Sequence, residues 1–177
     1  PTDRFGTPIS EEEIRARALS GPLRILFLGN VIERKGLQTL LEAVSVQPPA
    51  FQVEVVGSLN SEPQYVRQIR RMIEQKNLSS VVSLHGSLDK EPLVEKLRQA
   101  HVLVVPSSYE GYGIVYLEGM AFGLPAIGTR SGAASEIIED GKTGYLIQPQ
   151  DSDSLFRKLK ALAEDRGLLT HLSLDAR

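Results

Sequence analysis

The stretch from Glu110 to Glu118 has the residue types of a ligand-binding loop that leads into a helix. A loop carboxylate such as Glu110 can accept hydrogen bonds from hydroxyl groups, as sugars require. Glycine frees the backbone before the helix, so the N–H groups of Gly113, Ile114 and Val115 can point at one anion. Glu118 falls on an otherwise apolar helix, where a carboxylate is costly unless it is paired or holds a ligand. The spacing favours a ligand with an anionic group and hydroxyls over two glutamates with only local partners.

A second candidate anion site follows the first apolar run of the sequence. Gly29 ends that run, and Arg34 and Lys35 precede Gly36 and a helical segment. Backbone N–H groups and the dipole at such a helix start favour an anion, and the two cations add charge. The segment matches neither the Walker loop nor the GxGxxG fingerprint. A solvated loop with incidental charges is the alternative.

Two weaker signals follow the next apolar runs. Gly57 would let a ligand or another backbone segment approach closely, and turn formation explains it equally well. His85 and Gly86 come after a third run, where a lone histidine beside glycine is more often a satisfied turn residue than an acid or base. No Asp, Glu or second His lies at metal-ligand spacing around His85, so we expect no metal site.

Short apolar runs alternate with helical segments along the whole chain, as expected for a parallel sheet with helices on both faces. The predicted strands are 24–29, 51–57, 81–84, 101–105, 125–128 and 145–147. The predicted helices are 37–46, 62–75, 90–99, 114–122, 133–139 and 151–164. The fold class is therefore α/β, a doubly wound Rossmann-like parallel sheet of about six strands. In such sheets ligands bind beyond the carboxyl ends of the strands, where all the candidate loops lie.

We divide the chain into a lead-in segment, residues 1–22, and one domain, residues 23–177. The lead-in has a short helix that ends at about Ser20, with a capping box formed by Ser10 and Glu13.

Composition narrows the function classes. The 177 residues include 20 Lys and Arg against 22 Asp and Glu, so no basic footprint for nucleic acid is present. Without cysteine there is no disulfide framework and no thiolate nucleophile, which is compatible with a cytoplasmic protein. The longest apolar runs have the length of strands rather than of membrane spans.

The sequence resembles the donor-binding half of the retaining GT-B glycosyltransferases of family 4, the glycosyl transferases group 1. The resemblance covers residues 23–164, nearly the whole chain. Its most specific part is the order EGYG…E at 110–118 followed by AFGLP at 121–125. Weaker matches are Gly29…RKG at 34–36, FQVEVVG at 51–57, Gly132…Glu136 and GKTGYLI at 141–147.

The resemblance implies roles for the candidate residues. Lys35, with Arg34, would hold the donor diphosphate together with the backbone of Gly113, Ile114 and Val115. Glu110 would be the catalytic carboxylate and contact the hydroxyls of the donor sugar. Gly111 and Tyr112 would help to bind that sugar, and Glu118 would bind the ribose. Gly57, His85 and Gly86 would line the base pocket, mainly through backbone groups.

The resemblance also implies partners. The ligand would be a nucleotide-diphosphate sugar, with no metal or other cofactor, because cations and helix ends stabilise the leaving diphosphate. An amino-terminal acceptor domain would be missing, so the chain alone would be inactive. We also expect the closing helix, which crosses back to that domain in the family, to be absent after about Gly167. Peripheral membrane association of a full-length enzyme stays open.

The sequence departs from the family pattern at three places. Asn30 stands where many members carry arginine, Ser58 replaces a usual second glycine, and Ser135 precedes Glu136 where many have proline.

Three other functions are alternatives to this interpretation. Two of them are a sugar-nucleotide epimerase of the same architecture and a stand-alone nucleotide-sugar-binding domain. A flavodoxin-like or NAD-binding module is disfavoured, since the first loop lacks its glycine fingerprint and its acids.

Overall fold

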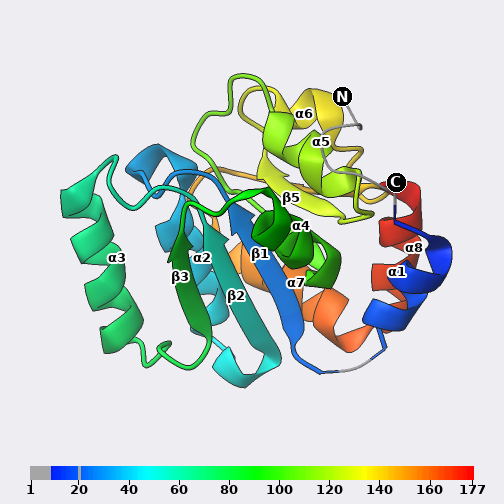
Figure 1. The fold of residues 1–177 in the computed structure, drawn as a ribbon, viewed down its shortest axis with the longest axis horizontal. Coiled ribbons are helices and arrows are strands. Elements are labelled where there is room, and N and C mark those ends of the chain that lie inside the picture. The colour runs from blue at the N-terminus through cyan, green and yellow to red at the C-terminus, as the bar shows by residue number, and fades with distance from the viewer. Residues whose placement is uncertain (1–8, 20) are drawn as a thin grey trace.

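The computed structural model describes residues 9–19 and 21–177, and in them the chain forms one six-stranded parallel sheet (Figure 1). The strands run in the order β3-β2-β1-β4-β5-β6. They are β1 (Leu23–Leu28), β2 (Phe51–Val56), β3 (Val82–Gly86), β4 (Val102–Val104), β5 (Ala126–Thr129) and β6 (Gly144–Ile147). This is the doubly wound order, and it confirms the predicted fold class.

Helices cover both faces of the sheet (Figure 1). The first face packs against α2 (Leu37–Val44), α3 (Pro63–Gln75), α7 (Ser152–Glu164) and α8 (Arg166–Asp175). The second packs against α4 (Lys90–Gln99), α5 (Ile114–Met120) and α6 (Ala134–Ile137).

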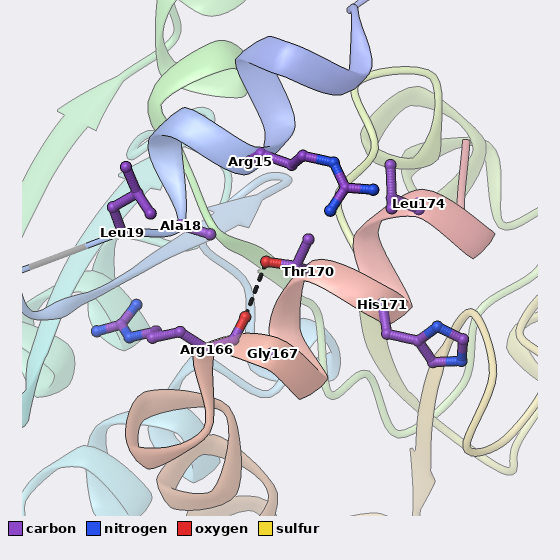
Figure 2. Close-up of a pocket in the computed structure, with 8 residues that line it drawn as sticks. All are labelled: Arg15, Ala18, Leu19, Arg166, Gly167, Thr170, His171 and Leu174. Atoms are coloured by element: carbon purple, nitrogen blue, oxygen red, sulfur yellow. Dashed lines mark hydrogen bonds between the residues drawn. The ribbon is translucent and has the colours of Figure 1, made fainter.

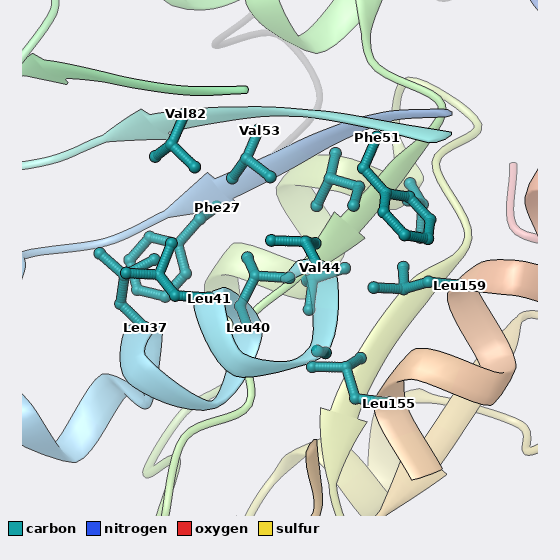
Figure 3. Close-up of a cluster of buried hydrophobic side chains, with 14 of the residues drawn as sticks. Phe27, Leu37, Leu40, Leu41, Val44, Phe51, Val53, Val82, Leu155 and Leu159 are labelled. Atoms are coloured by element: carbon teal, nitrogen blue, oxygen red, sulfur yellow. The ribbon is translucent and has the colours of Figure 1, made fainter. Parts of the chain in front are cut away.

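The central strand β1 shows why its sequence is apolar at nearly every position. Ile25 and Phe27 point into the core on the α2 side, while Leu26 points into the core on the α4 side. All three are fully buried. Figure 3 shows Phe27 packed against side chains of α2 and beside neighbouring strands. Burying each such side chain contributes roughly 1.5–3 kcal/mol, so both helical layers depend on this strand.

The carboxyl-terminal end holds a helix that the sequence did not predict. The last predicted helix ends at about residue 164, and α8 follows it over Arg166–Asp175, with the Asp165 side chain accepting a hydrogen bond from the Leu168 amide. Leu169 and Leu172 of α8 are buried in the core of the first face. The apolar spacing of these leucines on a short helix was too brief a signal to stand out.

The lead-in helix is α1 (Glu11–Arg17), and its capping box is confirmed. The Ser10 hydroxyl accepts a hydrogen bond from the Glu13 amide, and Glu13 accepts one from the Ser10 amide. The helix is shorter than expected, and Ser20 lies outside the described residues. Arg17 donates to the carbonyls of Phe122 and Gly123 beyond α5, so the lead-in is fastened to the domain.

Among the described residues, no helix has the length and apolarity that crossing a membrane requires.

A buried histidine lies at the amino ends of the strands. The Nδ1 atom of His101 accepts a hydrogen bond from the Arg24 amide at 3.0 Å, and its Nε2 atom lies 2.6 Å from the Arg17 carbonyl. This arrangement requires a neutral ring with the proton on Nε2. Burial, then the charge of Arg24, lower the pKa of His101 from 6.5 to about 3, and they outweigh the hydrogen bond to the Arg17 carbonyl, which raises it.

This histidine makes stability depend on pH. Because the pKa is lower in the folded than in the unfolded chain, its contribution is complete above pH 6.5 and is lost progressively down to about pH 3. We expect the free energy of unfolding to fall by a few kcal/mol over that range. His101→Asn keeps an acceptor near the Nδ1 position and should flatten this part of the profile. Urea denaturation of both proteins at several pH values measures the free energy of unfolding. The same pH dependence in both would contradict the lowered pKa of His101.

Candidate functional site

The strand order changes direction between β1 and β4, and the loops that follow these two strands meet there. After β1 comes a single 3-10 turn, η2 (Glu33–Lys35), and after β4 comes the loop that contains Glu110. Lys35 Nζ lies 2.5 Å from Glu110 Oε2, and the two side chains are only 13% and 11% exposed. The structure therefore brings together two residues that lie 75 positions apart in the chain.

A cavity of about 290 Å³ opens beside this ion pair, at the carboxyl ends of β1 and β2. Lys35 and the half-buried Glu118 supply its charged groups, and leucines supply an apolar side. Its lining consists of Leu28, Gly29, Asn30, Lys35, Val56, Gly57, Ser87, Leu88, Leu93, Val115 and Glu118. Charged groups with apolar surface suit a ligand that has both an anionic part and a flat or apolar part.

Glycine at position 57 is required by the packing of two backbone segments. Its φ is +149°, and a Cβ there would lie 2.0 Å from the Gly29 carbonyl oxygen. The Gly57 amide donates to the Gly86 carbonyl at 2.9 Å. The sequence left open whether Gly57 allows a close approach or only forms a turn. The structure shows that it allows the close approach of another backbone segment, and Gly57 also lines the cavity.

The first turn of α5 faces the same region. Gly113 precedes it with a φ of +64°, and a Cβ at this position would lie 2.3 Å from Ile137 Cδ1. The amides of Ile114 and Val115 are in the first turn, where an α-helix offers them no internal partner. Val115 lines the cavity, while Tyr112 is 85% exposed and Gly111 has open space around it.

Arg34 lies apart from Lys35, although we expected the two to act together. Its guanidinium donates to the Tyr109 carbonyl at 2.5 Å. It lines a separate cavity of about 350 Å³ with Glu33, Glu62 and others. Arg34 and Lys35 are consecutive in η2 but line different cavities, and of the two it is Lys35 that lines the cavity beside Glu118.

His85 and Gly86 do not line the cavity either. The His85 ring contacts the Glu54 carboxylate, which also accepts a hydrogen bond from Lys96 at 2.9 Å. Burial alone would raise the pKa of Glu54, but the hydrogen bonds from Lys96 and His85 outweigh it and lower the pKa. His85 therefore belongs to a side-chain cluster with Glu54 of β2 and Lys96 of α4.

Sequence reasoning missed the residues that follow His85 and Gly86. Ser87, Leu88 and Leu93 line the cavity instead. Ligands of such sheets bind beyond the strand ends, which points to the segment after β3. Its three lining residues, however, form no recognisable motif. Only the position of the strand end could have indicated them.

A larger cavity, of about 450 Å³, lies between α1 and α8 (Figure 2). Its lining includes Arg15, Leu19, Arg166 and His171, and the Thr170 hydroxyl donates to the Arg166 carbonyl beside it. None of its lining residues follows the carboxyl end of a strand, so it is distinct from the candidate site. Within residues 9–19 and 21–177, no group of three or more His, Asp or Glu side chains could hold a metal ion.

The fold and this site define a doubly wound α/β domain with a ligand-sized cavity at its switch point, and comparison with known proteins gives the family. Residues 10–177 match the family "Glycosyl transferases group 1", and the chain belongs to it. The chain thus has a glycosyltransferase domain.

Curated relatives are longer than this chain. It is 31% identical over 151 residues to a D-inositol 3-phosphate glycosyltransferase of Arthrobacter, covering 82% of this chain and 35% of the relative. It is 29% identical to the putative colanic acid biosynthesis glycosyltransferase WcaL of Escherichia coli, covering 89% of this chain and 40% of that protein. The chain spans less than half the length of these relatives.

Solved structures agree on the fold. The C-terminal domain of a glycosyl transferase group 1 protein, LpcC of Francisella tularensis, superposes with a TM-score of 0.83 at 25% identity, covering 99% of this chain and 93% of that one. Anabaena HepE, solved in complex with UDP and glucose, has a TM-score of 0.85 at 23% identity, and the match covers 99% of this chain and 48% of HepE.

The Gly57 geometry gives a stability prediction. Gly57→Ala combines a left-handed φ with a clash against Gly29, so we expect it to lower the free energy of unfolding by at least about 2 kcal/mol. Gly111→Ala is the matched control, because a Cβ there meets nothing within 4 Å, and its effect should stay within about 1 kcal/mol. Chemical denaturation measures both, and equal effects would show that the close approach of the Gly57 and Gly29 backbones tolerates a side chain.

Proposed function

We propose that this chain is the donor-binding half of a retaining glycosyltransferase and that it binds a nucleotide-diphosphate sugar. The observation that carries the proposal is a cavity at the switch point of the sheet that Lys35 and Glu118 line, with Glu110 paired to Lys35 beside it. Ligands of doubly wound sheets bind at such switch points. Membership of the glycosyl transferases group 1 supports the reaction class.

Each part of the donor has a matching group. Lys35 and the amides of Ile114 and Val115 would bind the diphosphate, and the Glu118 carboxylate would accept hydrogen bonds from the ribose hydroxyls. The base would lie against Leu88 and Leu93, on the apolar side of the cavity. We assign to Glu110 the hydroxyls of the sugar and the catalytic role, because it lies next to the cation that would hold the diphosphate.

The Lys35–Glu110 pair is compatible with this assignment. A lysine ammonium has three donors, so Lys35 can contact a phosphate while one of its N–H groups still points to Glu110. The carboxylate is then never left buried without a partner, which would cost several kcal/mol. When the glycosidic bond to the diphosphate breaks, the developing negative charge is stabilised by a cation already in place.

The proposal extends to the rest of the enzyme. A second domain would supply the acceptor site, in line with relatives that are more than twice as long as this chain. Lys35 and the α5 amides meet the diphosphate charge in this scheme, so it requires no divalent cation, and donor affinity should be unchanged by EDTA. Retention of configuration, a cytoplasmic location and peripheral membrane association are further parts of the proposal.

Calorimetric titration tests the donor assignment. UDP, GDP and ADP, each alone and as its glucose conjugate, serve as probes. Lys35→Ala should weaken binding of the diphosphate about 10- to 100-fold, because it removes a charged hydrogen-bond donor. Glu118→Ala should weaken diphosphate and conjugate alike, whereas Glu110→Ala should weaken only the conjugate.

The control for Lys35→Ala is Lys142→Ala. Lys142 is an exposed lysine that pairs with Glu139, away from the cavity, and its loss changes the net charge by the same amount. Lys142→Ala should leave the affinities for the diphosphates and their glucose conjugates unchanged. Failure of all three diphosphates to bind at millimolar concentration would refute the proposal, and a uniform loss in all three site variants would refute the separate roles.

A further inference from the structure

Glu110 has a second partner that lines no part of the cavity. The Ser107 hydroxyl donates to Glu110 Oε2 at 3.3 Å, and Ser107 is fully buried. The same carboxylate oxygen therefore accepts from Lys35 on one side and from Ser107 on the other. Ser107 can affect a bound sugar only through Glu110.

Ser107 is itself held by a neighbouring strand. The hydroxyl of Thr129, at the end of β5, donates to the Ser107 carbonyl at 2.6 Å, and Thr129 is buried. The Tyr116 hydroxyl from α5 donates to the Val105 carbonyl at 2.8 Å. Burial, then the charge of Glu110, raise the pKa of Tyr116, so this hydroxyl remains a donor. Two hydroxyls from different elements thus fix the backbone that enters the Glu110 loop.

The backbone of Glu110 is fixed as firmly as its side chain. Its carbonyl accepts a hydrogen bond from the Ala133 amide at 2.8 Å. A Cβ at Gly132 would lie 2.2 Å from the same carbonyl oxygen, so glycine lets the two segments meet. With its carbonyl held by the loop after β5, Glu110 can move only by side-chain rotation. Lys35 and Ser107 are the two contacts described that oppose this rotation.

We propose that Ser107 is a positioning residue for recognition of the donor sugar, and that Thr129 supports it. This inference rests on the proposed function, since it concerns the sugar contact of Glu110. When a diphosphate engages Lys35, the ammonium is shared between phosphate and carboxylate, and its hold on Glu110 weakens. The Ser107 hydroxyl, which the ligand does not reach, keeps the carboxylate oriented toward the sugar hydroxyls.

The measurable quantity is the glucose increment, defined as the Kd of a nucleoside diphosphate divided by the Kd of its glucose conjugate. The probes are UDP, GDP and ADP and their glucose conjugates, titrated calorimetrically into the whole chain. The Ser107–Glu110 bond is long, at 3.3 Å. Ser107→Ala should therefore lower the increment about three- to tenfold, the effect of one hydrogen bond of ordinary strength, while diphosphate affinity changes less than about twofold.

A second pair of variants keeps the test valid if Ser107→Ala folds poorly. Thr129→Val preserves the shape and removes the hydroxyl, so it should lower the increment, and Thr129→Ser should restore it. Ser108→Ala is the control, because the Ser108 hydroxyl is exposed and bonds to the Arg34 carbonyl instead. It should leave the increment as in the unmodified chain.

The outcomes separate this inference from the proposed function. If no diphosphate binds, the proposed function fails. If a diphosphate binds and the increment is the same in Ser107→Ala and in the unmodified chain, the positioning role alone is overturned. Equal losses of diphosphate and conjugate affinity in Ser107→Ala and Thr129→Val would also overturn it, since they would indicate a merely structural role.

Discussion

The ion pair between Lys35 and Glu110 spans the point where the winding of the sheet reverses, and the site depends on it. At this point β1 and β4 are neighbours, yet their helices leave toward opposite faces of the sheet. The two loops therefore separate above the strands and leave room for a ligand. Two opposite charges across that space hold the loops at hydrogen-bond distance while keeping both charges satisfied.

Much of the fold could be predicted from sequence, because its signals are local. The run at Ile25–Leu28 is apolar on both faces, and helix α4 matches its predicted range of Lys90–Gln99. Capping residues such as Ser10 and Asp151 fix helix starts by hydrogen bonds within one turn. Helix α8 escaped prediction because its burial depends on packing against distant elements, and its own sequence has only a short apolar pattern.

The site was less predictable, for a physical reason. Glycine motifs and charged residues indicate that a loop binds something, but not which side chains converge. Arg34 and Lys35 are adjacent in sequence and yet line different cavities, because a tight turn points successive side chains in different directions. Likewise, His85 has a titratable side chain, but it contacts Glu54 of β2 and does not line the cavity, whereas Leu88 does.

The hydrogen bonds around His101 attach helices to the sheet at the end opposite the ligand cavity. Arg17 of α1 donates to the Phe122 carbonyl beyond α5, and Arg24 of β1 donates to the Gln99 carbonyl at the end of α4. Arg166 of α8 donates to the Gly21 carbonyl just before β1. All of this lies at the amino ends of the strands, opposite the cavity. Loops at the carboxyl ends can therefore change in length or composition without loosening the connections that hold the helices to the sheet. A scaffold of this kind can diverge toward new ligands while it keeps its fold.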